Sequence, residues 1–171
     1  MASFRDDSDD LQRLDWSLLQ NGPVTLYFSR AVLEGDVAWL LDHGYVVNRL
    51  DCRAWKDAAS ALGELARELQ FPDYFGKNLD ALNDCLGDLS VPDGSGRAVV
   101  LEHFDRAMSL QETFCTALLD IFATQSRAHL LFGRRLFAMV QSDDPRLSIG
   151  PVGATPVTWN QRESLDEVRG V

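Results

Sequence analysis

The sequence predicts an α/β fold: a small parallel β-sheet of three to four strands flanked by helices, with an extension at each end. The main observation is that strand-like and helix-like segments alternate between residues 24 and 142. This pattern is typical of parallel sheets, because helices supply the crossover connections. The second observation is size, since 171 residues, 46% of them hydrophobic, suffice for a domain with its own core. We therefore expect a single domain.

The N-terminal part is expected to add one β-α-β unit after a leader. Residues 1–10 are rich in aspartate and serine and predict a disordered leader. An Asn-Gly-Pro sequence at residues 21–23 ends a short helix. Compact β-branched runs and the helical spacing of apolar residues identify the elements that follow. We expect a short helix within 11–22, a strand over 24–28, a helix over 31–44 and a strand over 45–52.

The C-terminal part continues this alternation. Pro72 and Gly76 break the chain after one helix, and Asn78 is a good N-cap for the next. Ser109, followed by Glu112 three residues later, predicts another helix start. We expect helices over 55–69, 78–89 and 109–125, strands over 97–104 and 134–142, and a last short helix within 161–170. The chain thus divides into a leader with a short helix (1–22), an α/β domain (23–142) and a C-terminal extension (143–171).

The chain is strongly acidic. It has 26 acidic and 16 basic residues and a net charge of -10. This charge disfavours direct binding to nucleic acids or anionic membranes and suits a cationic protein partner, although acidity is also a common solubility trait. Cys52, Cys85 and Cys115 are isolated, which predicts reduced thiols. The sequence has no signal peptide and no run of about 18 apolar residues, so we expect a cytoplasmic protein.

Motifs for catalysis are missing from the sequence. No HExxH, paired CxxC or GxxxxGK[ST] sequence occurs, so we expect no metal, no cofactor and no enzyme activity. The histidines His43, His103 and His129 lie at the ends of predicted elements, where structural or surface roles are expected. The catalytic alternative is a hydrolase that uses Asp80 and Asp84 as paired carboxylates. An acid catalyst usually needs an apolar pocket, however, and these two residues lie on a polar helix face.

The helix over 78–89 is expected to display an acidic face. Its leucines share one side, and the opposite side carries Asp80, Asn83, Asp84 and Asp88. Like charges one helical turn apart repel by about 0.2–0.5 kcal/mol per pair, and no Lys or Arg at i+4 neutralises them. Two interpretations stay open. The face is simply solvated, or, beside the aromatic loop that precedes it, it anchors the protein in a basic cleft of a partner.

Residues 71–86 resemble the signature of the barstar family of intracellular ribonuclease inhibitors. That signature is an apolar residue and Pro, an acid, an aromatic pair, Gly, any residue, Asn-Leu-Asp-Ala-Leu, any residue, and Asp-Cys-Leu. Here it reads FPDYFGKNLDALNDCL. The predicted order of elements over 45–142 also resembles the family. The resemblance implies a barstar-like fold and a protein that blocks secreted guanyl-specific ribonucleases such as barnase.

The resemblance also implies a set of partner-binding residues. Tyr74, Gly76 and Asn78 would lie in the loop that enters the cleft of the ribonuclease. Asp80 would meet basic residues of the enzyme, and Asp84 would be the central anchor in place of a substrate phosphate. The expected partner is therefore a basic, secreted ribonuclease or ribonuclease toxin, bound by a monomer of this chain.

Asn83 departs from the family pattern, and we include it among the partner-binding residues. The best-known member of the family has tryptophans at the positions of Asn83 and Leu89, and its interface glutamate has Thr124 as the nearest counterpart. These departures concern the identity of the target more than the binding mode. The alternative is a barstar-fold interaction module whose partner is not a ribonuclease.

Overall fold

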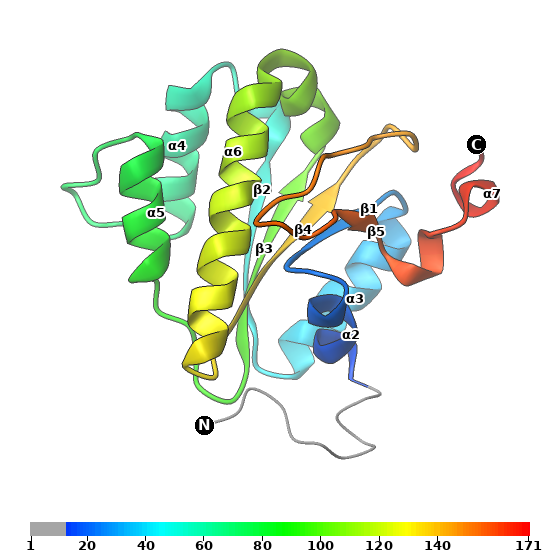
Figure 1. The fold of residues 1–171 in the computed structure, drawn as a ribbon, viewed down its shortest axis with the longest axis horizontal. Helices are drawn as coiled ribbons and strands as arrows, with labels where there is room; N and C mark the ends of the chain where they lie inside the picture. Colours follow the sequence, from blue (N-terminus) through cyan, green and yellow to red (C-terminus); the bar gives the residue numbers. More distant parts are fainter. Residues whose placement is uncertain (1–12) are drawn as a thin grey trace.

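The computed structural model describes residues 13–171, and the leader predicted for residues 1–10 lies outside this range. The centre of the fold is a five-stranded sheet in the order β2 (Val46–Asp51), β3 (Gly96–Glu102), β4 (Arg135–Gln141), β1 (Val24–Tyr27) and β5 (Thr158–Trp159), in which all neighbouring strands are parallel. Helices cover both faces of this sheet (Figure 1). The predicted α/β class with a parallel sheet is confirmed.

The helices and strands follow the predicted alternation. In chain order they are α2 (Leu14–Gln20), β1 (Val24–Tyr27), α3 (Arg30–Asp42), β2 (Val46–Asp51), the 3-10 turn η1 (Cys52–Ala54), α4 (Ala58–Glu68), α5 (Leu79–Gly87), β3 (Gly96–Glu102), α6 (Phe104–Leu131), β4 (Arg135–Gln141), β5 (Thr158–Trp159), the 3-10 turn η2 (Gln161–Glu163) and α7 (Asp166–Arg169). Except in α6 and the C-terminal extension, the predicted ends differ from these bounds by a few residues at most.

Each face of the sheet buries its own apolar cluster. Helices α4, α5 and α6 pack on one face, and α2 and α3 pack on the other (Figure 1). All seven residues of β4, near the middle of the sheet, are buried. Because side chains alternate along a strand, Ala138 joins the cluster under α6 and its neighbour Met139 joins the cluster under α3. The two central strands β3 and β4 therefore contain the apolar runs Ala98–Leu101 and Leu136–Val140, as expected for a sheet covered on both faces.

The sheet has one strand more than the largest number predicted. β1 pairs with β4, and the two-residue strand β5 adds to the far side of β1. So short a strand, in a segment rich in Gly, Pro and Thr, leaves no periodic signal in the sequence. Part of the C-terminal extension therefore belongs to the sheet. The division of the chain at residues 22 and 142 stays a prediction.

The helix predicted to begin at Ser109 begins earlier. The N-cap of α6 is His103, at a φ of 53°. The hydroxyl of Ser109 does not cap a helix but donates to the backbone carbonyl of Arg106 (2.8 Å), and a non-helical backbone at Gln111 interrupts the helix. The added first turns form because Phe104 is fully buried in the core, and tertiary packing of this kind overrides a local capping pattern.

The cysteines are free thiols, as predicted. Cys52 and Cys115 are buried and Cys85 is half-buried. Burial raises the pKa of the Cys115 thiol to about 12, so this thiol stays protonated at neutral pH. Of the helices within residues 13–171, none has the length and apolar character that a membrane span requires.

Candidate partner-binding face

Helix α5 is held against the fold by its buried leucines and by a hydrogen bond near its C-terminal end. Its leucines Leu82 and Leu86 are fully buried in the cluster under α4 and α6. At its start, Oδ1 of Asn78 accepts a hydrogen bond from the N–H of Ala81 (2.8 Å), which confirms the predicted N-cap. Near its end, a ring nitrogen of the buried His129 lies 2.8 Å from the backbone carbonyl of Leu86. The helix is therefore a rigid platform for the side chains on its outer face.

The carboxylates of α5 and its C-cap face solvent. Asp80, Asp84 and Asp88 are all exposed. Within residues 13–171, no ion pair involves any of the three, and Lys77, the nearest cation in the sequence, forms none either. We call these three aspartates the acidic face. It presents negative charge that the described part of the chain does not neutralise.

The two aromatic residues in the loop before α5, Tyr74 and Phe75, differ in burial. Phe75 is buried, and its ring lies 5.1 Å from that of Phe71. Tyr74, by contrast, is 84% exposed. The N–H of Phe75 donates to the carbonyl of Pro72 (2.9 Å), which closes the turn that projects Tyr74 outward. Gly76 is exposed after this turn, and a Cβ there would lie 3.3 Å from the side chain of the N-cap residue. The loop therefore offers one aromatic ring to solvent next to the acidic face.

Asn83 does not share the exposure of the three aspartates. It is half-buried where α5 meets α6, and its Oδ1 accepts a hydrogen bond from Nε2 of Gln125 (2.8 Å). The assignment of Asn83 to the solvent-facing side is therefore corrected, while its role in partner binding stays a prediction. Sequence reasoning missed Gln125, because a contact between two helices leaves no local pattern. Thr124, beside it, is exposed, and Leu89 is buried.

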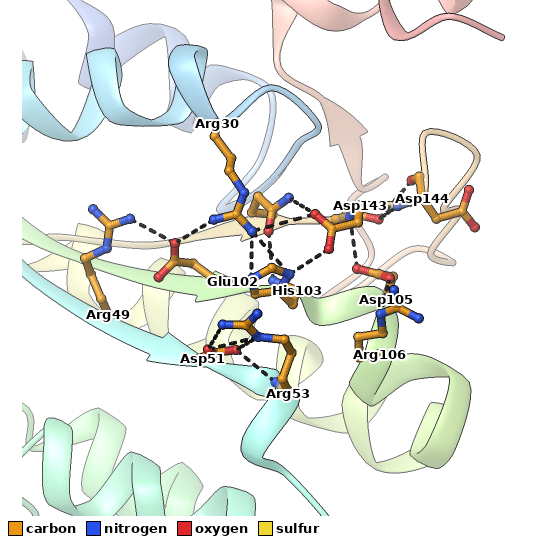
Figure 2. A network of polar contacts seen from close by, with 12 residues as sticks. Arg30, Arg49, Asp51, Arg53, Glu102, His103, Asp105, Arg106, Asp143 and Asp144 are labelled. Atoms are coloured by element: carbon orange, nitrogen blue, oxygen red, sulfur yellow. Dashed lines mark hydrogen bonds and ion pairs between the residues drawn. The ribbon is translucent and has the colours of Figure 1, made fainter.

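A second cluster of charges lies at the carboxyl ends of β2, β3 and β4 (Figure 2). The guanidinium of Arg49 lies 3.0 Å from the carboxylate of Glu102. Just beyond the carboxyl ends of β3 and β4, Nδ1 of His103 lies 2.7 Å from the carboxylate of Asp143. We call this set the strand-end network; its members are Arg30, Arg49, Asp51, Arg53, Glu102, His103, Gln141 and Asp143.

Partners within the chain stabilise the ionised carboxylates of the strand-end network. Hydrogen bonds from Arg53 hold the pKa of Asp51 below its usual value. For Asp143, burial opposes ionisation, but hydrogen bonds from Gln141 and His103 outweigh it and lower the pKa. The network therefore links the strand ends through neutralised charges. In the part of the chain that the structure describes, no three His, Cys, Asp or Glu side chains are grouped so that they could hold a metal ion.

Comparisons with known proteins place this fold in a family. A family model described as Barstar (barnase inhibitor) matches residues 45–140, which is more than half of the chain and includes the acidic face. The Bacillus subtilis protein "Putative ribonuclease inhibitor YrdF" is 32% identical over 73 residues, which cover 42% of this chain and 76% of YrdF. A Walker-type ATPase of Pyrococcus abyssi has a similar structure at a TM-score of 0.44 and 17% identity, over 83% of this chain and 47% of that one, a likeness too distant to carry an argument. From the family match, the chain belongs to the barstar family.

Proposed function

We propose that this chain inhibits a ribonuclease by placing the acidic face of α5 in the basic active-site cleft of the enzyme. The observation that carries the proposal is a set of exposed carboxylates on a fixed helix, with no neutralising group among residues 13–171. Membership of the barstar family and the name of YrdF support a binding protein of this class rather than an enzyme. The proposed target is a secreted, guanyl-specific, barnase-like ribonuclease or ribonuclease toxin.

Five of the predicted partner-binding residues have a proposed role. Asp84 lies at the middle of α5 and is the central anchor, standing in for a substrate phosphate among the cations of the cleft. Asp80, one turn earlier, meets further basic residues. Tyr74, Gly76 and Asn78 belong to the loop and N-cap that lead into α5, and this loop enters the cleft.

Carboxylates on a rigid helix can imitate phosphates without offering a bond that the enzyme could cleave. A ribonuclease cleft is built to bind a polyanion, so its cations accept carboxylates at comparable positions. Fixing the helix in advance avoids the cost of ordering its backbone on binding, about 1–2 kcal/mol per residue. The repulsion along α5 is relieved when the cations of the enzyme approach. Binding and inhibition therefore follow from the same geometry.

Capture followed by an activity assay tests this proposal. The immobilised full chain is exposed to the cell extract and secreted proteins of the source organism, and retained proteins are assayed for RNA cleavage. We expect a basic ribonuclease whose activity falls to background when an equimolar amount of free chain is added. Columns carrying Asp84→Ala and Asp88→Ala serve as a matched pair, and only the first should lose the ribonuclease. A retained ribonuclease that the chain does not inhibit would contradict the proposal.

A second candidate is a barstar-fold interaction module with a partner that is not a ribonuclease. One observation favours it: Asn83 and Gln125 present paired amides where the best-known family member has an aromatic ring. In the same capture experiment, a protein without ribonuclease activity that binds the wild-type chain and not Asp84→Ala would support this candidate.

A further inference from the structure

The short strand β5 forms one edge of the sheet, away from the acidic face. Within residues 13–171 it pairs with β1 alone, and in Figure 1 α6 lies between it and α5. Edge strands of this kind present backbone groups to which a further strand can pair.

The backbone of Trp159 points away from β1. The register pairs Leu26 with Trp159, and the N–H of Asn160 donates to the carbonyl of Leu26 (2.8 Å). In a parallel ladder, a residue whose backbone groups face the adjacent strand bonds to the two neighbours of its partner, and the backbone groups of the partner itself point away. Leu26 is the bonded residue here, so the N–H and C=O of its partner Trp159 lie on the outer side of β5. No hydrogen bond within residues 13–171 occupies these two groups. They form one donor and acceptor pair available to an added strand.

Cavities lie beside this edge on both faces of the sheet. A cavity of about 640 Å³ is lined by Leu26, Leu147 and Val157 on the α6 face. A cavity of about 510 Å³ is lined by Thr25 and residues of α2 and α3 on the opposite face, and Trp159 borders both. Consecutive side chains of a strand point to opposite faces. An added strand would therefore place alternate side chains in the two cavities.

The charges at this edge define the chemistry of the segment. Arg146 lines the cavity on the α6 face, is exposed, and forms no ion pair within residues 13–171. Arg162 lines the other cavity, and its side chain is 54% exposed although it pairs with the buried Asp36. The exposed Asp166 is matched by Arg169. Two exposed arginines, Arg146 and Arg162, therefore lie at this edge, and Arg146 has no ion pair within residues 13–171.

We propose that the β5 edge binds an extended segment of another protein, which adds a sixth strand to the sheet. The segment hydrogen-bonds to the backbone of Trp159 and inserts an apolar side chain into the cavity on the α6 face. Acidic residues next to this apolar residue in the segment pair with Arg146, at the rim of the cavity on the α6 face, and with Arg162, which lines the cavity on the opposite face. This is the β-strand addition mode of recognition, in which main-chain bonds supply affinity and alternate pockets supply specificity. The surface is separate from the acidic face, so the inference goes beyond the proposed inhibition.

Selection from a display library of eight-residue peptides, with the full chain as bait, tests the proposal. We expect the selected peptides to carry an apolar residue flanked by acidic ones. A synthetic peptide of the selected sequence should slow hydrogen exchange at the amide of Trp159. No enriched pattern, or an amide of Trp159 that exchanges equally fast with and without the peptide, would overturn the proposal.

Matched variants locate the binding site. Arg146→Glu changes an exposed side chain and should weaken the peptide about tenfold or more without affecting the fold, whereas Asp84→Ala should bind the peptide as the wild type does. If Asp84→Ala weakens peptide binding and Arg146→Glu does not, the peptides would be assigned to the acidic face. If the chain forms a dimer that the peptide dissociates, the β5 edge would be assigned to the binding of a second copy of the chain. Either result would overturn the proposal.

Discussion

The acidic face of α5 and the strand-end network both contain aspartates, but they differ in whether those aspartates have partners within the described chain. In the network, Asp51 pairs with Arg53, and Asp143 lies beside His103. On the acidic face, Asp80 and Asp84 have no ion-pair partner anywhere in residues 13–171. The same side chain is therefore paired within the chain at one site and is left to solvent at the other.

This difference indicates what each region is for. A carboxylate that is paired inside the chain contributes to the stability of the chain itself, although exposed pairs contribute little, about 0–1 kcal/mol. Carboxylates one turn apart on a helix, without cations, are a small cost to the isolated protein. Such an arrangement is advantageous when another protein supplies the cations. The contrast leads to four predictions, given in order of decreasing effect.

Of these four, the largest effect is expected in the kinetics of association. Because the acidic face is unpaired, it should steer a basic ribonuclease, and steering of this kind raises association rates by about 10–10³-fold. The association rate, measured by stopped-flow fluorescence, should fall at least about tenfold between about 0.01 M and 1 M salt, as the Debye length shrinks from about 30 Å to about 3 Å. A rate that is independent of salt would show that the acidic face does not guide the encounter.

Gln141 tests the structural role of the strand-end network. It is fully buried, its Oε1 accepts a hydrogen bond from the N–H of His103 (2.8 Å), and its Nε2 donates to Asp143 (3.0 Å). In Gln141→Ala the backbone N–H of His103 loses its partner, so we expect unfolding in urea to show a loss of about 1–3 kcal/mol. Affinity for the ribonuclease should stay as in the wild type. Loss of affinity with unchanged stability would place the network in the interface and remove the contrast.

The Gln125→Ala variant tests how strongly the contact with α6 holds α5 in place. Gln125→Ala removes the hydrogen bond to Asn83, which should cost about 1 kcal/mol of stability. Hydrogen exchange of the α5 amides should become faster. Thr124→Ala is the matched control, because Thr124 is the exposed neighbour on the same helix. Equal exchange in both variants would mean that the leucines and the contact of His129 hold the helix without this bond.

The smallest effect concerns pH. The folded-state pKa of Asp143 is below its ordinary value of 3.8, so its stabilising contribution is present above that value and is lost as the pH falls through the folded pKa. Asp143→Asn should remove this part of the acid destabilisation. Because the side chain is 40% exposed, the expected difference at neutral pH is below about 1 kcal/mol. Unfolding curves between about pH 2 and pH 7 measure it, and identical pH dependence in both proteins would contradict the assignment.

The sequence predicted the features that depend on local pattern. The leucine face of α5 and the N-cap Asn78 follow from helical periodicity and capping chemistry, both readable within a dozen residues. The family signature in residues 71–86 added the expectation of a partner for the aspartates. The parallel sheet followed from the alternation of elements.

The features that sequence reasoning missed depend on contacts between distant parts of the chain. The strand β5 forms only because β1 offers it an edge, and the carboxylate of Glu163 accepts hydrogen bonds from the N–H groups of Phe28 and Ser29 (3.1 and 2.6 Å), which ties the C-terminal extension to the start of α3. Gln125 and Asn83 likewise meet only after α5 packs on α6. No periodic pattern encodes such contacts, so they became visible only in the structure.

The most direct test of the central claim is the affinity of two matched variants for the captured ribonuclease. Asp84 and Asp88 are both exposed and unpaired within residues 13–171, but only Asp84 lies within α5, at the centre of the proposed interface. Titration calorimetry should show that Asp84→Ala weakens binding by about 2–5 kcal/mol, a range drawn in part from the barnase and barstar pair itself, while Asp88→Ala changes it by less than about 1 kcal/mol. Equal affinities of the two variants would contradict the claim that Asp84 anchors the complex.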